Sequence, residues 1–146
     1  MTPDDAIGTA SRSKAPVTPE FTVERANRAL VLVRKIVAEI VARYGELMGL
    51  RAQRDRLLET PGQAERAEFL GERIAACVEN LNARNCELTT IGCVLKDWRT
   101  GLVDFPATHE GHRVWLCWRY GEPTVAYWHD LHDGVAGRKR IEDDFR

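Results

Sequence analysis

The chain has 146 residues, of which 44% are hydrophobic and 29% charged, and its formal net charge is −1. This length is typical of one domain that folds around its own core, and the composition is typical of a soluble globular protein. The balanced charge argues against a broad surface for nucleic acid or for a membrane, because such surfaces are strongly basic. No apolar stretch reaches the roughly 18 residues of a membrane span.

The beginning of the chain and its cysteines favour a cytoplasmic protein. The start, Met1-Thr2-Pro3-Asp4-Asp5, has neither the basic nor the apolar region of a secretory signal. The prolines and small polar residues of residues 1–19 predict a disordered tail. The four cysteines show no CxxC spacing, which favours a reduced compartment; they are Cys77, Cys86, Cys93 and Cys117.

Residues 20–90 predict two amphipathic helices. The first begins after Thr22, a good N-cap residue, and extends to about residue 59; Thr60-Pro61-Gly62 then breaks it. A second helix follows from about Ala64, and the short link predicts an antiparallel hairpin. Apolar residues recur every third or fourth position in both helices: Leu30, Val33, Val37, Ile40, Tyr44 and Leu47, then Leu70, Ile74, Cys77, Leu81 and Leu88.

These apolar stripes are narrow and long, so one partner helix is not expected to bury them. We predict that residues 20–90 are a dimerisation arm, and that a second copy of the chain covers the stripes in a four-helix homodimer. The alternative is that the C-terminal sheet covers them within one chain.

Residues 91–141 change to short runs of aromatic and β-branched residues separated by turn residues. Cys93–Trp98, Leu102–Phe105, Arg113–Arg119 and Thr124–His129 predict an antiparallel meander of about four strands. Residues 142–146 predict a charged C-terminal tail. The predicted fold class is therefore α+β: a long antiparallel helical hairpin, coiled-coil-like, followed by a small antiparallel β-meander.

Several C-terminal segments come in a recognisable order: Leu95-Lys96-Asp97, Gly101–Pro106, Val114–Trp118, Gly121-Glu122, Tyr127-Trp128-His129 and Gly134–Arg138. Together with Phe21–Ala26 they resemble a bacterial family known only as a domain of unknown function. The resemblance covers about residues 20–141 and implies a helical hairpin, a small β region and the cytoplasmic compartment. It supplies no catalytic residues.

Side chains suited to metal and ligand chemistry are concentrated in the β region, where all four histidines lie between positions 109 and 132. Two-residue turns at Thr100-Gly101 and Glu110-Gly111 place Asp97 opposite Asp104 and Asp104 opposite Cys117, on one face of the sheet. The other face then carries the predicted core residues: Val103, Phe105, Val114, Leu116 and Trp118.

Neighbouring carboxylates repel unless a cation, a shared proton or an arginine lies between them. One hypothesis is therefore that Asp97 and Asp104, with His129 or Glu122, bind a divalent metal ion. Carboxylate with imidazole suits Mn²⁺, Fe²⁺ or Zn²⁺, and carboxylate with water alone suits Mg²⁺. The interpretation that the sequence favours over it is that Arg99 or Arg119 neutralises the carboxylates at an exposed surface.

Two further features have ordinary structural explanations. Cys117 is a nucleophile only if His129 or Arg119 makes it a thiolate, and otherwise it is a buried apolar cysteine. The basic run Arg138-Lys139-Arg140 is followed at once by Glu142-Asp143-Asp144, so nucleic-acid binding is not predicted.

The predicted function is a non-enzymatic, homodimeric interaction module of the cytoplasm, whose protein partner or small ligand the sequence does not identify. The alternative is a metal-binding protein or a small metal-dependent enzyme. In that alternative the carboxylates are ligands, and His129 is a ligand or the general base.

Overall fold

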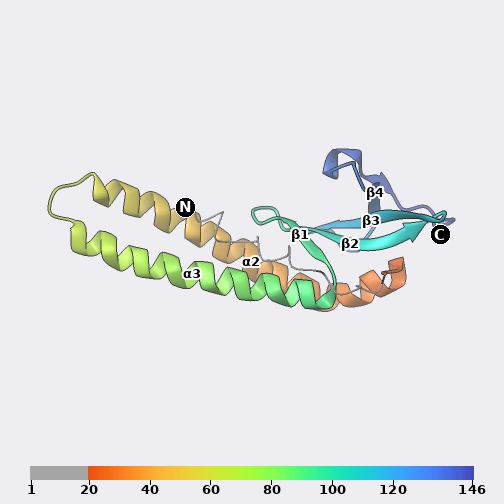
Figure 1. Cartoon of the computed structure of the whole chain (residues 1–146), viewed down its shortest axis with the longest axis horizontal. Coiled ribbons are helices and arrows are strands. Elements are labelled where there is room, and N and C mark those ends of the chain that lie inside the picture. Colours follow the sequence, from red (N-terminus) through yellow and green to blue (C-terminus); the bar gives the residue numbers. More distant parts are fainter. Residues whose placement is uncertain (1–19) are drawn as a thin grey trace.

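The structure is a computed structural model that describes residues 20–146, so the tail predicted for residues 1–19 lies outside the described residues. Helix α2 (Val23–Leu58) and helix α3 (Ala64–Ile91) form an antiparallel hairpin, and a five-stranded sheet follows them in the chain. The sheet lies over the N-terminal half of α2, while the closed end of the hairpin extends past the sheet (Figure 1). The predicted α+β class is confirmed.

Local signals in the sequence fix the ends of the hairpin helices. Thr22 is extended, and its side chain accepts a hydrogen bond of 3.1 Å from the backbone N–H of Arg25, as an N-cap does. Helix α3 ends at Gly92, whose φ of 111° is a left-handed conformation that favours glycine. The turn after Gly92 directs the chain from the hairpin into the first strand.

The apolar stripe of α2 is covered within one chain. Val33, Val37, Ile40 and Leu47 have no exposed surface, and they belong to one core with residues of α3 and of the sheet. The apolar stripe of α2 is therefore covered by α3 and by the sheet of the same chain. The sequence had predicted that a second copy of the chain covers it. Homodimerisation itself stays a prediction, but the stripe is no longer a reason for it.

The strands of the sheet are β1 (Val94–Asp97), β2 (Leu102–His109), β3 (His112–Arg119), β4 (Tyr127–Asp130) and β5 (Lys139–Arg140), and they are neighbours in that order. Every pairing between neighbours is antiparallel. The fifth strand was not predicted; it has two residues and follows a short 3₁₀ helix, η2 (Val135–Gly137). The predicted core face of β2 and β3 is confirmed, because its residues belong to the hydrophobic core formed with the helices: Val103, Phe105, Val114, Leu116 and Trp118.

The register between β2 and β3 is the predicted one. His109 pairs with His112 across the two-residue turn Glu110-Gly111, and both turn residues have positive φ. Asp104 is therefore opposite Cys117.

The register between β1 and β2 differs from the prediction. Asp97 pairs with Leu102, Asp104 faces Val94, and the pairing is irregular between Leu95 and Asp97. The reason is the turn, which holds residues 98–101 rather than two residues. Gly101 is the residue that makes this turn fit against α2: its φ is +74°, and an added Cβ would lie 2.7 Å from Cγ1 of Val37.

No helix among residues 20–146 is long and apolar enough to cross a bilayer. Residues 142–146, predicted as a charged tail, return to the sheet, where the ring of Phe145 stacks on that of His109 with centroids 4.2 Å apart.

Candidate functional site

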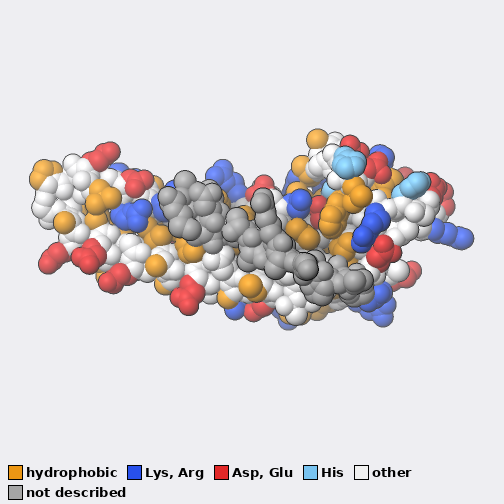
Figure 2. All heavy atoms as spheres, viewed as in Figure 1, with side chains coloured by type: hydrophobic (Ala, Val, Ile, Leu, Met, Phe, Trp, Pro, Cys, Tyr) orange, Lys and Arg blue, Asp and Glu red, His pale blue; other side chains and the backbone are white. Residues whose placement is uncertain are grey.

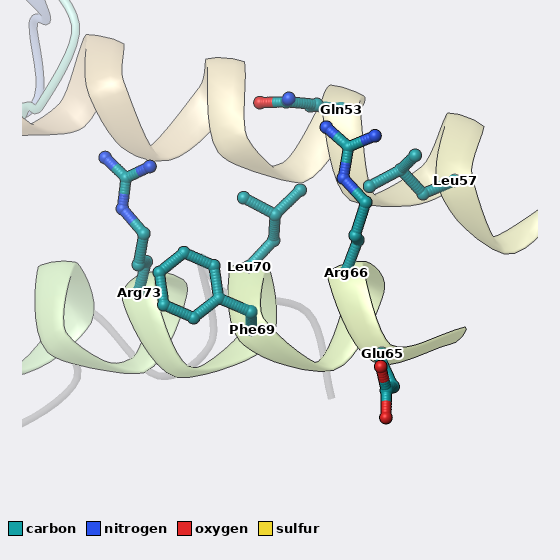
Figure 3. A pocket seen from close by; sticks show the side chains of 7 residues that line it. All are labelled: Gln53, Leu57, Glu65, Arg66, Phe69, Leu70 and Arg73. Carbon is teal, nitrogen blue, oxygen red and sulfur yellow. The ribbon is translucent and has the colours of Figure 1, made fainter. Parts of the chain in front are cut away.

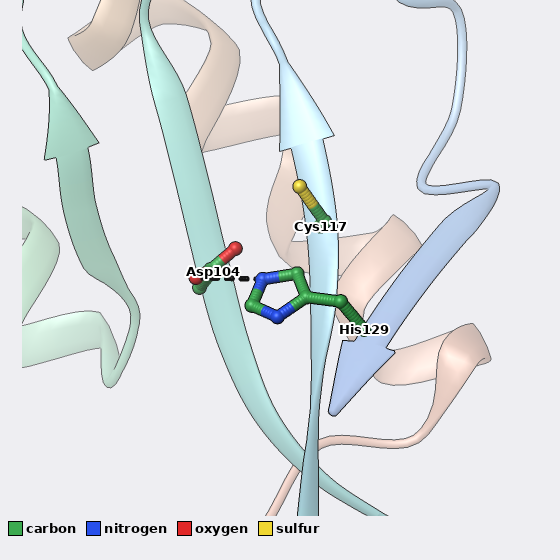
Figure 4. Close-up of side chains that lie close together, drawn as sticks. All are labelled: Asp104, Cys117 and His129. Atoms are coloured by element: carbon green, nitrogen blue, oxygen red, sulfur yellow. Dashed lines mark hydrogen bonds and ion pairs between the residues drawn. The ribbon is translucent and has the colours of Figure 1, made fainter. Parts of the chain in front are cut away.

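Three side chains with metal-ligand atoms meet on the sheet face that points away from α2: Asp104 of β2, Cys117 of β3 and His129 of β4 (Figure 4). The register explains the meeting. Asp104 and Cys117 are direct partners, and His129 faces Trp115, which is two residues from Cys117 and therefore on the same face. One ligand atom from each of the three residues lies within 4.8 Å of the other two. Within residues 20–146 this is the one group of three or more such residues.

The group is buried. The exposed fraction is 1% for Asp104, 0% for Cys117 and 4% for His129. Nε2 of His129 lies 3.1 Å from Oδ2 of Asp104. The thiol of Cys117 is the other polar neighbour of this carboxyl group. Oδ1 of Asp104 nevertheless makes no hydrogen bond of good geometry with any described residue. A buried carboxyl oxygen without a partner costs about 1–3 kcal/mol of folding free energy, so it marks a place where a further group is expected.

His129 is held in a defined tautomer. Its Nδ1 lies 2.9 Å from the backbone carbonyl oxygen of Asp130, which can only accept a hydrogen bond, so Nδ1 carries a proton. Nε2 is then the nitrogen directed at Asp104. Metal-binding histidines are commonly oriented in this way, with the second ring nitrogen donating to a carbonyl or a carboxylate.

Burial also shifts the pKa values of the other two residues. Burial raises the pKa of the Asp104 carboxyl above its usual value and outweighs the opposing influence of His129. Burial, together with the nearby charge of Asp104, raises the pKa of the Cys117 thiol to about 12. Cys117 is therefore a neutral thiol near neutral pH, which disfavours the interpretation of this residue as a thiolate nucleophile.

The structure does not bring Asp97 into this group, so the predicted pairing of Asp97 with Asp104 is wrong. Oδ1 of Asp97 accepts hydrogen bonds from the backbone N–H groups of Arg99 (2.8 Å) and Thr100 (3.3 Å). The carboxylate thus closes the β1–β2 turn from within, a role that aspartate often has in turns.

Glu122 is also outside the group, because Arg138 occupies its carboxylate. The two Nη atoms of Arg138 lie 3.0 and 2.8 Å from the two carboxylate oxygens, and the backbone N–H of Arg119 donates a further hydrogen bond of 2.7 Å. Although burial would raise the pKa of Glu122, these hydrogen bonds hold it below its usual value. Of the predicted ligands, the structure brings together Asp104 and His129.

The lowered pKa of Glu122 gives a pH-dependent prediction. A carboxylate whose pKa is depressed on folding contributes stability above its unfolded pKa, and this contribution is lost as the pH falls through the folded pKa. We expect Glu122→Gln to lower the free energy of unfolding by about 1–2 kcal/mol at pH 7, and the difference from the original protein to shrink below pH 4.5, the usual Glu value. Urea denaturation at pH 7, 5 and 3.5 measures this; a difference as large at pH 3.5 as at pH 7 would contradict it.

Cys117 was not predicted as a metal ligand, although the predicted register already placed it beside Asp104. The signal was present in the strand pairing, but the sequence contains no CxxC or similar spacing that marks a cysteine ligand. The donor set that the structure assembles is thus one carboxylate, one thiol and one imidazole.

Comparisons with known proteins give a family. The chain matches no curated protein and no solved structure. The model of a family described as an uncharacterized conserved protein (DUF2203) matches residues 20–141, a range that holds both helices and all five strands. The chain therefore belongs to this family of uncharacterized conserved proteins, DUF2203.

Proposed function

We propose that this protein binds a metal ion through Asp104, Cys117 and His129. The observation that carries the proposal is the buried convergence of these three side chains from neighbouring strands, with Oδ1 of Asp104 left without a partner. A metal ion would give that oxygen a partner and would take up the negative charges of the carboxylate and of a deprotonated thiol. The orientation of the His129 ring by Asp130 supports the same interpretation.

The donor set favours Zn²⁺ or Fe²⁺. A thiolate is a soft ligand, and together with imidazole and carboxylate it suits these two ions, whereas Mg²⁺ prefers oxygen ligands. The sequence suggested Mn²⁺, Fe²⁺, Zn²⁺ or Mg²⁺ for a ligand set that included Asp97 and Glu122. The proposed set contains Cys117 and neither of those residues, so the choice of metal narrows to Zn²⁺ or Fe²⁺. Three protein ligands also leave one position of a tetrahedral ion for water or a small ligand.

The test is the metal content of protein purified without an affinity tag, together with thermal unfolding in the presence of added Zn²⁺, Fe²⁺, Mn²⁺ or Mg²⁺. We expect one equivalent of bound metal and an increase in Tm with Zn²⁺ or Fe²⁺, because a ligand that binds only the folded state stabilises it. Asp97→Asn is the matched control, since Asp97 lies outside the group. No bound metal and no change in Tm with any of the four ions would reject the proposal.

Self-association through the hairpin is the second candidate, and a specific surface favours it. At the closed end of the hairpin, where hydrophobic side chains lie on the surface among charged ones (Figure 2), Leu58 and Phe69 are 63% and 59% exposed. Phe69 borders a hollow between α2 and α3, in which Arg66 and Arg73 of α3 extend towards α2 (Figure 3). The occupant that we propose is a second copy of the chain. Residues 51–73 contain five arginines and five acidic residues, and a contact between identical surfaces needs such self-complementary charge.

Light scattering tests this candidate. We expect twice the chain mass of 16.5 kDa at high protein concentration, and the monomer mass for Phe69→Glu, because a charge in the apolar contact is not tolerated. The control is Val31→Glu, which changes an equally exposed apolar residue of α2 far from the closed end. A monomer at all concentrations, or dissociation by both variants alike, would contradict this interface.

A further inference from the structure

Arg138 connects three separate segments behind the proposed metal centre. Its Nη2 donates to the backbone carbonyl oxygen of Cys117 at 3.3 Å, in addition to the two bonds to the Glu122 carboxylate. Its guanidinium lies 4.0 Å from the centroid of the Tyr127 ring. The side chain is only 14% exposed and that of Glu122 only 22%, so this ion pair is largely removed from water.

The position of Arg138 follows from the strand pairing. The pairing of β3 with β4 ends at Cys117 and Tyr127, after which the chain makes a loop before it returns as β4. At this end of the ladder the guanidinium supplies a donor to the carbonyl group of Cys117. Glu122 keeps the guanidinium in place, and it is itself fixed because its backbone carbonyl accepts from Nε1 of Trp118 at 3.0 Å.

We infer that Arg138 and Glu122 form a positioning pair that holds Cys117 in place beside Asp104 and His129, an inference that rests on the proposed metal-binding function. Of the three proposed ligands, Cys117 is the one whose backbone Arg138 contacts by a hydrogen bond. The pair therefore positions the sulfur ligand. Loss of the pair changes the contact between the sulfur and the metal more than it changes the contacts of the carboxylate and the imidazole with the metal. Groups that orient metal ligands in this way commonly change metal affinity by about 10–100-fold.

The experiment uses Co²⁺ as the probe, because a thiolate bound to Co²⁺ gives a charge-transfer absorption that carboxylate and imidazole ligands do not. The variants are Arg138→Met, Glu122→Gln and the conservative Arg138→Lys. Lys139→Met is the matched control: Lys139 is the next residue, it also lies over an aromatic ring, and its ion pair with Asp130 is about half exposed. Circular dichroism checks that each variant is folded.

For Arg138→Met and Glu122→Gln we expect a Co²⁺ affinity at least about tenfold lower and a weaker thiolate absorption per bound Co²⁺. Arg138→Lys recovers part of the absorption, because an ammonium group keeps the charge and one hydrogen bond but not the paired geometry. Lys139→Met leaves both quantities unchanged.

Two results would overturn the inference while the metal-binding proposal stands. One is unchanged affinity and absorption in Arg138→Met. The other is that Arg138→Met loses stability but shows the full thiolate absorption when saturated with Co²⁺. In that case the pair would stabilise the fold without positioning Cys117. If the original protein binds no Co²⁺ at all, the metal-binding proposal itself fails.

Discussion

Cys117→Ser is expected to lower Zn²⁺ affinity by more than about 100-fold while the protein remains folded. The substitution changes one buried atom and keeps a polar hydrogen, so the packing on the outer face of the sheet is largely retained. It removes the soft ligand, however, and loss of a ligand costs more than the 10–100-fold typical of the groups behind it. Competition titration against a chelator of known affinity measures the change.

Cys93 provides the matched control for this prediction. It is also buried, with 2% exposure, and burial likewise raises the pKa of its thiol to about 12. Its sulfur lies 3.5 Å from the backbone carbonyl oxygen of Leu88, at the end of the hairpin, and it belongs to no group of metal-ligand atoms among the described residues. We expect Cys93→Ser to keep the Zn²⁺ affinity of the original protein. Equal losses in the two variants would mean that the metal does not bind at Cys117.

The hairpin and the core face of the sheet could be predicted from the sequence because local signals determine them. The N-cap at Thr22, the breaker at Pro61-Gly62 and the three- and four-residue spacing of apolar residues fix the helices without reference to the rest of the fold. The turn at Glu110-Gly111 similarly fixes the register of β2 and β3, because its length allows one pairing.

The remaining features depend on contacts that the local sequence does not specify. The β1–β2 register differs from the prediction because the Asp97 side chain bonds its own turn, which moves Asp104 opposite Val94. The apolar stripe of α2 is buried because the sheet packs on the helix. The spacing of apolar residues along the helix predicts the stripe, but it does not tell which part of the fold covers it. Likewise, the sequence predicted Glu122 as a metal ligand. Only the structure shows that its carboxylate is already paired with Arg138.

The position of Cys117 depends both on a local turn and on a strand pairing that the local sequence does not specify. Its place opposite Asp104 follows from the Glu110-Gly111 turn, but its meeting with His129 requires the pairing of β3 with β4 across a loop. His129 could be predicted from its position at a strand end, and the place of Cys117 could be predicted from the strand register. The structure shows in addition that these three side chains are buried, which makes them a candidate metal site.

The buried contact between Asp104 and His129 makes a second large effect testable in the metal-free protein. We expect His129→Leu alone to lower the free energy of unfolding by about 1–3 kcal/mol, because removal of one partner leaves the other polar group buried without compensation. Asp104→Leu is expected to cost a similar amount for the same reason. The double variant should cost clearly less than the sum of the two, since two apolar side chains in contact need no polar partner.

Chemical denaturation of the four proteins with a chelator present gives the coupling energy between Asp104 and His129. The exposed pair of Lys139 and Asp130, with side chains 53% and 51% exposed, supplies the reference cycle, and exposed pairs typically couple by less than about 1 kcal/mol. A coupling energy for the buried pair no larger than this reference would show that each side chain is satisfied without the other. That result would contradict the expected coupling between Asp104 and His129.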